Sequence, residues 1–164
     1  MNNDKKLILS VGTSRLSKQW TRTEMWWSEF INRLSQPIRT AETSAEYHQM
    51  KKDQKGNLKD IGGFVGGTLN GLQRKASNVT GRDLITLDLD SIEPGQTENV
   101  IRTIDSLQMA YVVYSTRSHT PHRPRLRVVV PTDRTMTTDE YEPIARKLAE
   151  MIGIGMCDST TFEA

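Results

Sequence analysis

The architecture that we expect for this chain follows from the segment Leu84-Ile-Thr-Leu-Asp-Leu-Asp90. Apolar and polar residues alternate along it, which is typical of a β-strand with one buried face. On such a strand Leu87 and Leu89 point into the core, whereas Asp88 and Asp90 project together from the opposite face, about 7 Å apart at their Cα atoms. Aspartate is disfavoured in strands and two like charges on one face repel, so something must compensate for this pair.

The segments after Asp90 extend this strand into a mixed α and β fold. The patterns predict a helix over 97–107, strands over 110–115 and 125–130, and a helix over 137–152 that starts with a Thr137/Glu140 capping box and stops at Gly153. The order strand-helix-strand-strand-helix is that of a ferredoxin-like or RNA-recognition-motif core, an α+β (α/β) fold in which two helices cover one face of a four-stranded sheet. The last strand of that order should follow Gly153, but the eleven residues after Gly153 make a poor strand, so we expect the sheet to lack it.

The first half of the chain predicts a smaller α/β extension. A short strand is expected over 7–11, a helix over 21–34 with a Thr21/Glu24 capping box, and a helix over 43–55 that stops at Gly56. The segment 59–67 then carries two glycine pairs, which fit either a phosphate cradle or close packing. We expect one domain over 1–164, with the extension at 1–82 and the ferredoxin-like or RNA-recognition-motif core at 83–164.

Composition limits the function classes. The chain has 164 residues, a net charge of +2 and a single cysteine, Cys157, so a disulfide framework or a multi-cysteine zinc site within the chain is excluded. The start of the chain has no apolar run long enough for a signal peptide or a membrane span, which fits a reducing cytoplasm and no membrane partner. Charge is uneven: residues 83–110 hold six acids against one arginine, while 51–82 hold seven Lys/Arg against two acids.

The aspartate pair has two interpretations. A hard cation such as Mg²⁺ or Mn²⁺ takes one or two carboxylates and completes its shell with water and substrate phosphates, which would relieve the repulsion between Asp88 and Asp90. Alternatively, the two aspartates meet solvent or arginines at the end of the strand. The second interpretation needs no metal.

A basic segment follows, Ser115-Thr-Arg-Ser-His-Thr-Pro-His-Arg-Pro-Arg-Leu-Arg127. Arg125 and Arg127 alternate with apolar residues, so both leave one sheet face, where they could bind phosphates or form a ladder of ion pairs with the aspartates. His119 lies in the preceding loop, as a nucleotide contact or as a surface residue. A zinc site built from the histidines of this loop and Cys157 would lack a fourth ligand.

Three ordered motifs resemble those of the archaeo-eukaryotic primase superfamily, closest to the primase-polymerases of phages and prophages. They are the segments 86–90, 115–127 and 157–163, in the order in which that superfamily has them. The resemblance implies a DNA primase or polymerase, a nucleotidyltransferase of a phage, prophage or plasmid replication protein that works in the cytoplasm of a bacterial host. It also implies two-metal phosphoryl transfer, with Mg²⁺ or Mn²⁺ held by Asp88, Asp90 and Asp158.

The resemblance implies partners and further site residues as well. Residues of the middle motif would bind nucleoside triphosphates, and cations upstream of that motif would bind the single-stranded DNA template. A replicative helicase or a further C-terminal domain would complete the replication protein. The expected nucleotide-binding residues are Ser115, Arg117, His119, Arg125 and Arg127, and the expected template-binding residues are Lys59, Arg74, Lys75 and Arg82. The middle motif departs from the family pattern, because arginines occupy the strand where a histidine is usual. Which of these side chains holds the phosphates therefore stays open.

Other functions remain compatible with the sequence. A truncated, non-catalytic primase relative could keep the binding surface and act as a regulator or inhibitor. An RNA-recognition-motif binder would need aromatic residues on the central strands, where this chain has acids and arginines. A metal-dependent nuclease of similar fold is a further alternative.

Overall fold

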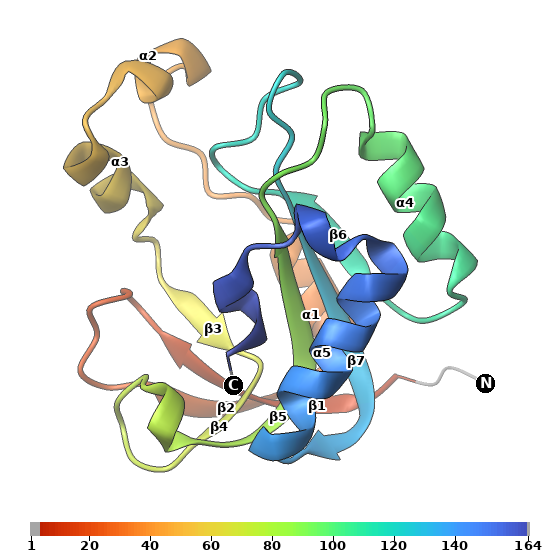
Figure 1. The fold of residues 1–164 in the computed structure, drawn as a ribbon. Coiled ribbons are helices and arrows are strands. Elements are labelled where there is room, and N and C mark those ends of the chain that lie inside the picture. The colour runs from red at the N-terminus through yellow and green to blue at the C-terminus, as the bar shows by residue number, and fades with distance from the viewer. Residues whose placement is uncertain (1–3, 164) are drawn as a thin grey trace.

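The computed structural model describes residues 4–163, which form two antiparallel sheets and five α-helices (Figure 1). The strands are β1 (Lys6–Gly12), β2 (Thr21–Trp26), β3 (Gly63–Val65), β4 (Gly67–Leu69), β5 (Val79–Leu89), β6 (Val112–Ser115) and β7 (Leu126–Met136). The helices are α1 (Trp27–Leu34), α2 (Ser44–Gln49), α3 (Lys52–Lys59), α4 (Thr97–Ser106) and α5 (Thr138–Ile152), with short 3-10 turns η1 (Ala76–Asn78), η2 (Ile154–Met156) and η3 (Ser159–Phe162). None of the helices in the described part of the chain is long and apolar enough to cross a membrane.

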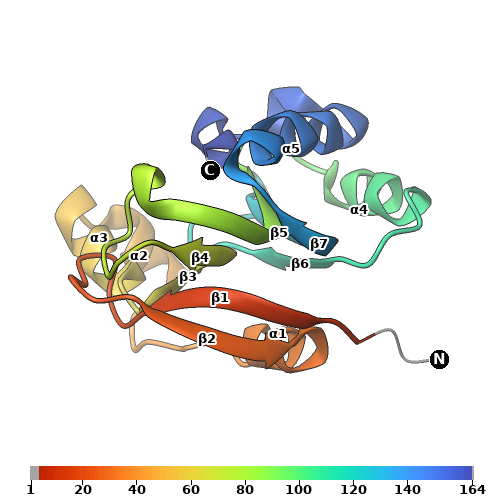
Figure 2. The same cartoon turned by 90° about the horizontal axis from the view of Figure 1, so that it is seen from below.

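The larger sheet has the strand order β4-β5-β7-β6 and carries α4 and α5 on one face (Figures 1 and 2). The predicted succession of strand, helix, two strands and helix is confirmed as β5-α4-β6-β7-α5. Leu87 and Leu89 of β5 are fully buried against the helices, together with Val128 of β7 and Ile104 of α4. The alternation along β5 therefore places its even-numbered residues, Asp88 among them, on the opposite face.

The fourth strand of this sheet comes from a part of the chain where we did not expect it. β4 lies before β5 in the sequence and pairs with it antiparallel, with Gly67 opposite Arg82. At its other end the same edge of β5 is bridged by the C-terminal segment, where Leu89 pairs with Cys157. No strand follows α5 in the described residues, as expected, but the sheet still has four strands because β4 supplies one, so the prediction of a sheet short of one strand is wrong. Two short segments share the edge that one final strand was expected to fill.

The smaller sheet, ordered β2-β1-β3, lies on the side of the larger sheet opposite α4 and α5 (Figure 2). A second apolar cluster lies between the two sheets and α1: Leu7 and Leu9 of β1, Trp27 and Phe30 of α1, Leu84 of β5 and Val129 of β7. Only the part of the large sheet beyond this cluster stays accessible, and that part carries the aspartates.

Two predicted helices of the first half are wrong in their bounds. Residues 21–26 form β2, which pairs with β1 over six residues, and the helix begins only at Trp27. The N–H of Trp26 donates to the Glu29 carboxylate, 2.8 Å away, so Glu29 and not Glu24 caps this helix. The helix expected over 43–55 is divided at Met50, whose backbone is extended, into α2 and α3. Gly56 lies inside α3 and does not end it.

The glycines of 59–67 serve close packing of backbones. A Cβ atom on Gly67 would lie 1.9 Å from the carbonyl oxygen of Gly81 on β5, and one on Gly66 would lie 2.7 Å from the Cβ of Leu84. The N–H groups of Asp83 and Leu84 both donate to the Gly66 carbonyl, at 2.8 and 3.0 Å. Side chains at these two positions would push the segment away from β5. Close packing against β5 therefore explains Gly66 and Gly67 without a bound phosphate.

Candidate functional site

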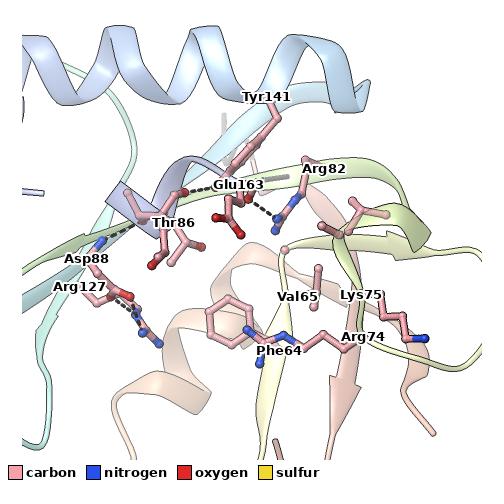
Figure 3. Close-up of a pocket in the computed structure, with 15 residues that line it drawn as sticks. Phe64, Val65, Arg74, Lys75, Arg82, Thr86, Asp88, Arg127, Tyr141 and Glu163 are labelled. Carbon is pink, nitrogen blue, oxygen red and sulfur yellow. Dashed lines mark hydrogen bonds and ion pairs between the residues drawn. The ribbon is translucent and has the colours of Figure 1, made fainter. Parts of the chain in front are cut away.

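Asp88 and Asp90 meet two arginines on the accessible part of the large sheet. Asp88 lies directly opposite Arg127 in the register of β5 and β7. Its two carboxylate oxygens accept hydrogen bonds from Nε and Nη2 of Arg127 at 2.5 and 2.9 Å, a bidentate pair (Figure 3). Asp90 accepts from Nη1 of Arg125 at 2.7 Å. The ladder of ion pairs, one of the two alternatives for these residues, is thus present.

The Asp88–Arg127 pair is partly buried. Burial disfavours the charge of Arg127, but the hydrogen bonds and charge of Asp88 outweigh burial, so the pKa of Arg127 is raised above its ordinary value. Tyr114 of β6 lies opposite Arg127 on its other side, and burial raises the pKa of this tyrosine. Arg127 therefore stays charged and holds both oxygens of Asp88.

Asp158 lies beside the same strand, but its carboxylate is bonded within its own turn. Its backbone N–H donates to the Asp88 carbonyl at 2.8 Å. Its carboxylate accepts from the N–H and the hydroxyl of Thr160, both at 2.9 Å, and caps η3. These hydrogen bonds, with a smaller contribution from the charge of Arg125, lower the pKa of Asp158. The third motif is therefore next to the first in space, while its acid is occupied with its own turn.

The carboxylates fit a metal ion only in part. Two aspartates on one face are a set that Mg²⁺ or Mn²⁺ accepts when substrate phosphates complete the shell. Among residues 4–163, however, no three His, Cys, Asp or Glu side chains lie close enough together to hold a metal ion. Asp88 and Asp90 could therefore hold a cation with a phosphate ligand, whereas the expected set of three acids is not assembled.

Thr161 ties the C-terminal segment to β5 next to Asp88. Its hydroxyl donates to the Thr86 carbonyl at 2.6 Å and accepts from the Asp88 N–H at 3.1 Å. Tyr141 of α5 donates its hydroxyl to the Thr161 carbonyl at 3.2 Å. The backbone just before Asp88 is thereby held by the C-terminal segment, and sequence reasoning did not identify these contacts.

A cavity of about 290 Å³, here called the β5 cavity, opens beside the Asp88–Arg127 pair (Figure 3). It is lined by residues of β3, β5, α5, the β4–β5 connection and the C-terminal segment, among them Phe64, Arg74, Lys75, Arg82, Asp88, Arg127, Tyr141 and Glu163. Three of the four predicted template-binding residues, Arg74, Lys75 and Arg82, gather here. Lys59 is exposed at the end of α3 and does not line this cavity.

Arg82 is the most enclosed of these three cations. Its guanidinium lies over the Tyr141 ring, 4.4 Å from the ring centre, and Nη2 donates to the Glu163 carbonyl at 3.1 Å. Its Nε is buried without a hydrogen-bond partner among the described residues. Burial, and to a lesser degree the charge of Arg74, lower the pKa of Arg82. Arg82 is thus a desolvated cation that no carboxylate in the described part of the chain pairs with.

A second cavity, of about 220 Å³, lies beside the Asp90–Arg125 pair, between α2, α3 and the loop that joins β6 to β7. We call it the loop cavity. In the described part of the chain its lining contains cations and hydroxyls but no carboxylate: Tyr47, His48, Lys55, Ser118, Thr120, Arg123 and Arg125. No pattern in the sequence pointed to Tyr47, His48 and Lys55, because the fold is what brings α2 and α3 to this loop.

The other predicted nucleotide-binding residues shape this loop. Arg117 pairs with Glu42 and lies over the Tyr47 ring, 5.2 Å from its centre. The ring Nδ1 of His119 accepts a hydrogen bond from the Arg125 N–H at 3.1 Å, which fixes the start of β7. Ser115 is exposed at the end of β6. Of the five expected nucleotide-binding residues, Arg125 lines the loop cavity, Arg127 lines the β5 cavity, and the other three line neither.

These features define a mixed α+β domain with two acid–arginine pairs on an open sheet face and a cationic cavity beside each pair. A family model described as the VapE N-terminal domain matches residues 1–164, so the chain belongs to that family, the N-terminal region of a phage- or prophage-type replication protein. No curated protein and no solved structure gave a match.

Proposed function

We propose that this domain is the primase-polymerase nucleotidyltransferase of its replication protein, adding nucleotides on a single-stranded template. The observation that carries the proposal is that Asp88, near the end of β5, and Asp90, directly after it, each pair with an arginine that lines a cavity rich in cations. Phosphoryl transfer needs little from a protein beyond positioning and charge neutralisation, and this surface offers both. The three motifs that resemble those of primases lie next to one another, because Arg127 pairs with Asp88 and the Asp158 N–H donates to the Asp88 carbonyl.

The loop cavity is suited to the triphosphate of an incoming nucleotide. Lys55, Arg123 and Arg125 can meet phosphate oxygens there, and the Ser118 and Thr120 hydroxyls can donate to them. In this arrangement Arg117 and His119 hold the loop in place rather than bind phosphate. The β5 cavity, with Arg74, Lys75 and Arg82, is left for the template strand.

Mg²⁺ or Mn²⁺ would be held by Asp88 and Asp90, and when bound would neutralise the charge of the triphosphate. Arg125 and Arg127 have a double role in this proposal. Without substrate they compensate the two carboxylates, and with substrate they bind phosphate oxygens through their planar donor groups. Asp158 would join the metal only if its carboxylate left Thr160.

A non-catalytic relative is the second candidate, and the carboxylate geometry favours it. Both aspartates are satisfied by arginines, and a cluster of three acids is not found among residues 4–163. In that case the same surface would bind nucleic acid or a protein partner without adding nucleotides, as a regulator or inhibitor of replication.

Nucleotide incorporation on single-stranded DNA separates the two candidates. The assay supplies Mn²⁺ or Mg²⁺, ribo- or deoxyribonucleoside triphosphates, and template with or without a primer. We expect incorporation by the wild-type chain and its loss in Asp90→Asn, while Asp139→Asn, a change of an exposed acid at the start of α5, stays active. Absence of incorporation under every condition, in a folded protein that still binds the strand, would leave the non-catalytic candidate.

A further inference from the structure

We propose that the β5 cavity holds one nucleotide of a single nucleic-acid strand, with its phosphate on Arg82 and its base against Phe64. The inference rests on the proposed function only in identifying this strand as the template. Figure 3 shows Phe64 of β3 and Arg82 of β5 reaching the same cavity, which also contains Asp88. A nucleotide bound there would lie next to the proposed catalytic pair.

The charge of the cavity favours a phosphate. Among residues 4–163, four cations and two carboxylates line it. Asp88 and Arg127 neutralise each other, so the three remaining cations, Arg74, Lys75 and Arg82, face one carboxylate of these residues, Glu163, a balance of +2. Enclosing the Arg82 charge is costly unless an anion or further hydrogen bonds compensate for it. A phosphate group is the acceptor that best matches a guanidinium, because two of its oxygens can accept two parallel hydrogen bonds.

Phe64 supplies the surface for a base. Its ring is partly exposed, and it packs edge-to-face against Phe30 at 5.0 Å between ring centres. That contact holds the ring in one orientation at the wall of the cavity. Cations that follow the backbone and an aromatic ring that stacks a base are the combination with which proteins bind single strands without sequence preference.

Backbone geometry keeps these groups in place around the cavity. The Gly66 carbonyl, one residue after Val65 at the end of β3, accepts from Asp83 and Leu84, so the strand that carries Phe64 is tied to the strand that carries Arg82. Tyr141 lies under the Arg82 guanidinium and is itself bonded to Thr161. The phosphate and base positions are therefore set by rigid elements rather than by flexible loops.

Strand binding can be measured by the fluorescence anisotropy of a labelled oligothymidylate, in the absence of metal ions and nucleoside triphosphates. Arg82→Met and Lys75→Gln should each weaken binding about tenfold at 50 mM salt, since each removes a charged contact. Each should also reduce the slope of log K against log salt by about 0.7. Phe64→Leu should weaken binding about fivefold or more and leave the salt slope unchanged, because stacking is not electrostatic.

Matched controls separate the cavity from general effects of charge or stability. Arg146 of α5 lies over the Phe162 ring at 4.5 Å, as Arg82 lies over Tyr141, but does not line the cavity. Arg146→Met and Lys147→Gln, an exposed change on the same helix, should bind the oligonucleotide like the wild type. The thermal midpoint of each variant shows whether it is folded, and Lys75→Gln, whose side chain is exposed, tests the cavity even if Arg82→Met is unstable.

The inference is overturned if Phe64→Leu binds normally, or if Lys75→Gln and a folded Arg82→Met keep the wild-type salt slope. Its failure is distinguishable from that of the proposed function. If the wild-type chain incorporates no nucleotide but the three variants lose strand binding, the polymerase proposal fails and the strand site stands. If the chain incorporates nucleotides and the variants bind normally, the reverse holds.

Discussion

Replacing Arg127 with methionine would expose the competition between an arginine and a metal ion for Asp88. The two side chains are 36% and 31% exposed, between the regime of surface pairs, worth up to about 1 kcal/mol, and that of buried pairs, whose disruption costs about 3–5 kcal/mol. We therefore expect Arg127→Met to destabilise the domain by about 2 kcal/mol. For a chain of 164 residues this corresponds to a fall in thermal midpoint of about 4–8 °C.

The free energy of the Asp88–Arg127 pair also determines the expected gain in metal affinity. If the wild-type protein must release Arg127 before Asp88 can bind a cation, removing Arg127 relieves that cost of about 2 kcal/mol. Since 1.4 kcal/mol is a factor of ten, the affinity for Mn²⁺ should rise up to about 30-fold. The variant should thus be less stable without metal and more strongly stabilised by it than the wild type.

Isothermal titration with Mn²⁺, without nucleotide, measures the affinity, and differential scanning calorimetry measures the stability. Arg134→Met is the control, because Arg134 makes a similar two-bonded pair with Glu140 at an exposed position away from Asp88. It should leave the Mn²⁺ affinity unchanged. Asp88→Asn added to Arg127→Met should remove the gain. An Mn²⁺ affinity that is the same in Arg127→Met and wild type would refute the assignment of Asp88 as a metal ligand.

Three further predictions concern the fold around the site. Gly67→Ala should lower the thermal midpoint by about 6 °C or more, because its Cβ would lie 1.9 Å from a backbone oxygen. Gly155→Ala is the control: a Cβ there meets none of the described atoms within 4 Å, so its midpoint should stay within about 2 °C of the wild type. Equal midpoints for the two variants would show that β4 is not held in this register. Hydrogen bonds from Arg134 and from Thr137 at the helix N-terminus lower the pKa of Glu140 from 4.5 to about 2. The stabilising effect of Glu140 should therefore be present above pH 4.5 and be lost as the pH falls toward 2. A difference in thermal midpoint between wild type and Glu140→Gln that is the same at pH 6 and pH 2.5 would contradict this. Burial and the charge of Asp88 raise the pKa of Cys157 from 9.0 to about 11. Iodoacetamide at pH 8 should therefore alkylate Cys157 about 100-fold more slowly in the folded chain than in the urea-unfolded chain. Similar rates would show that the thiol is not enclosed.

The second half of the fold could be predicted from the sequence because its signals are local. The apolar alternation in 84–89 and the helical periods of 97–106 and 138–152 each identify an element and its buried face without reference to the rest of the chain. The alternation also placed Asp88 and Arg127 on one sheet face. Their mutual pairing was one of two alternatives, since the sequence does not give the register between strands.

The first half was less predictable because its elements depend on distant partners. Residues 21–26 have helix-like apolar spacing together with the residues after them, but become a strand because β1 is available to pair with them. The glycines of β3 and β4 are explained only by the backbone of β5, which follows them in the sequence. Lys55 and Tyr47 became candidates for the loop cavity through the same kind of long-range contact.

The position of β4 and the apolar cluster between the sheets makes the two halves of the chain mutually dependent. Leu84 and Val129, on strands of the larger sheet, are buried by residues of β1 and α1, and the outer edge of β5 is paired by β4. An expression fragment that starts at residue 83 would expose both apolar residues and open that edge to pairing with other molecules. Such a fragment should aggregate although it carries all three motifs, so a minimal version of this domain has to begin before β1.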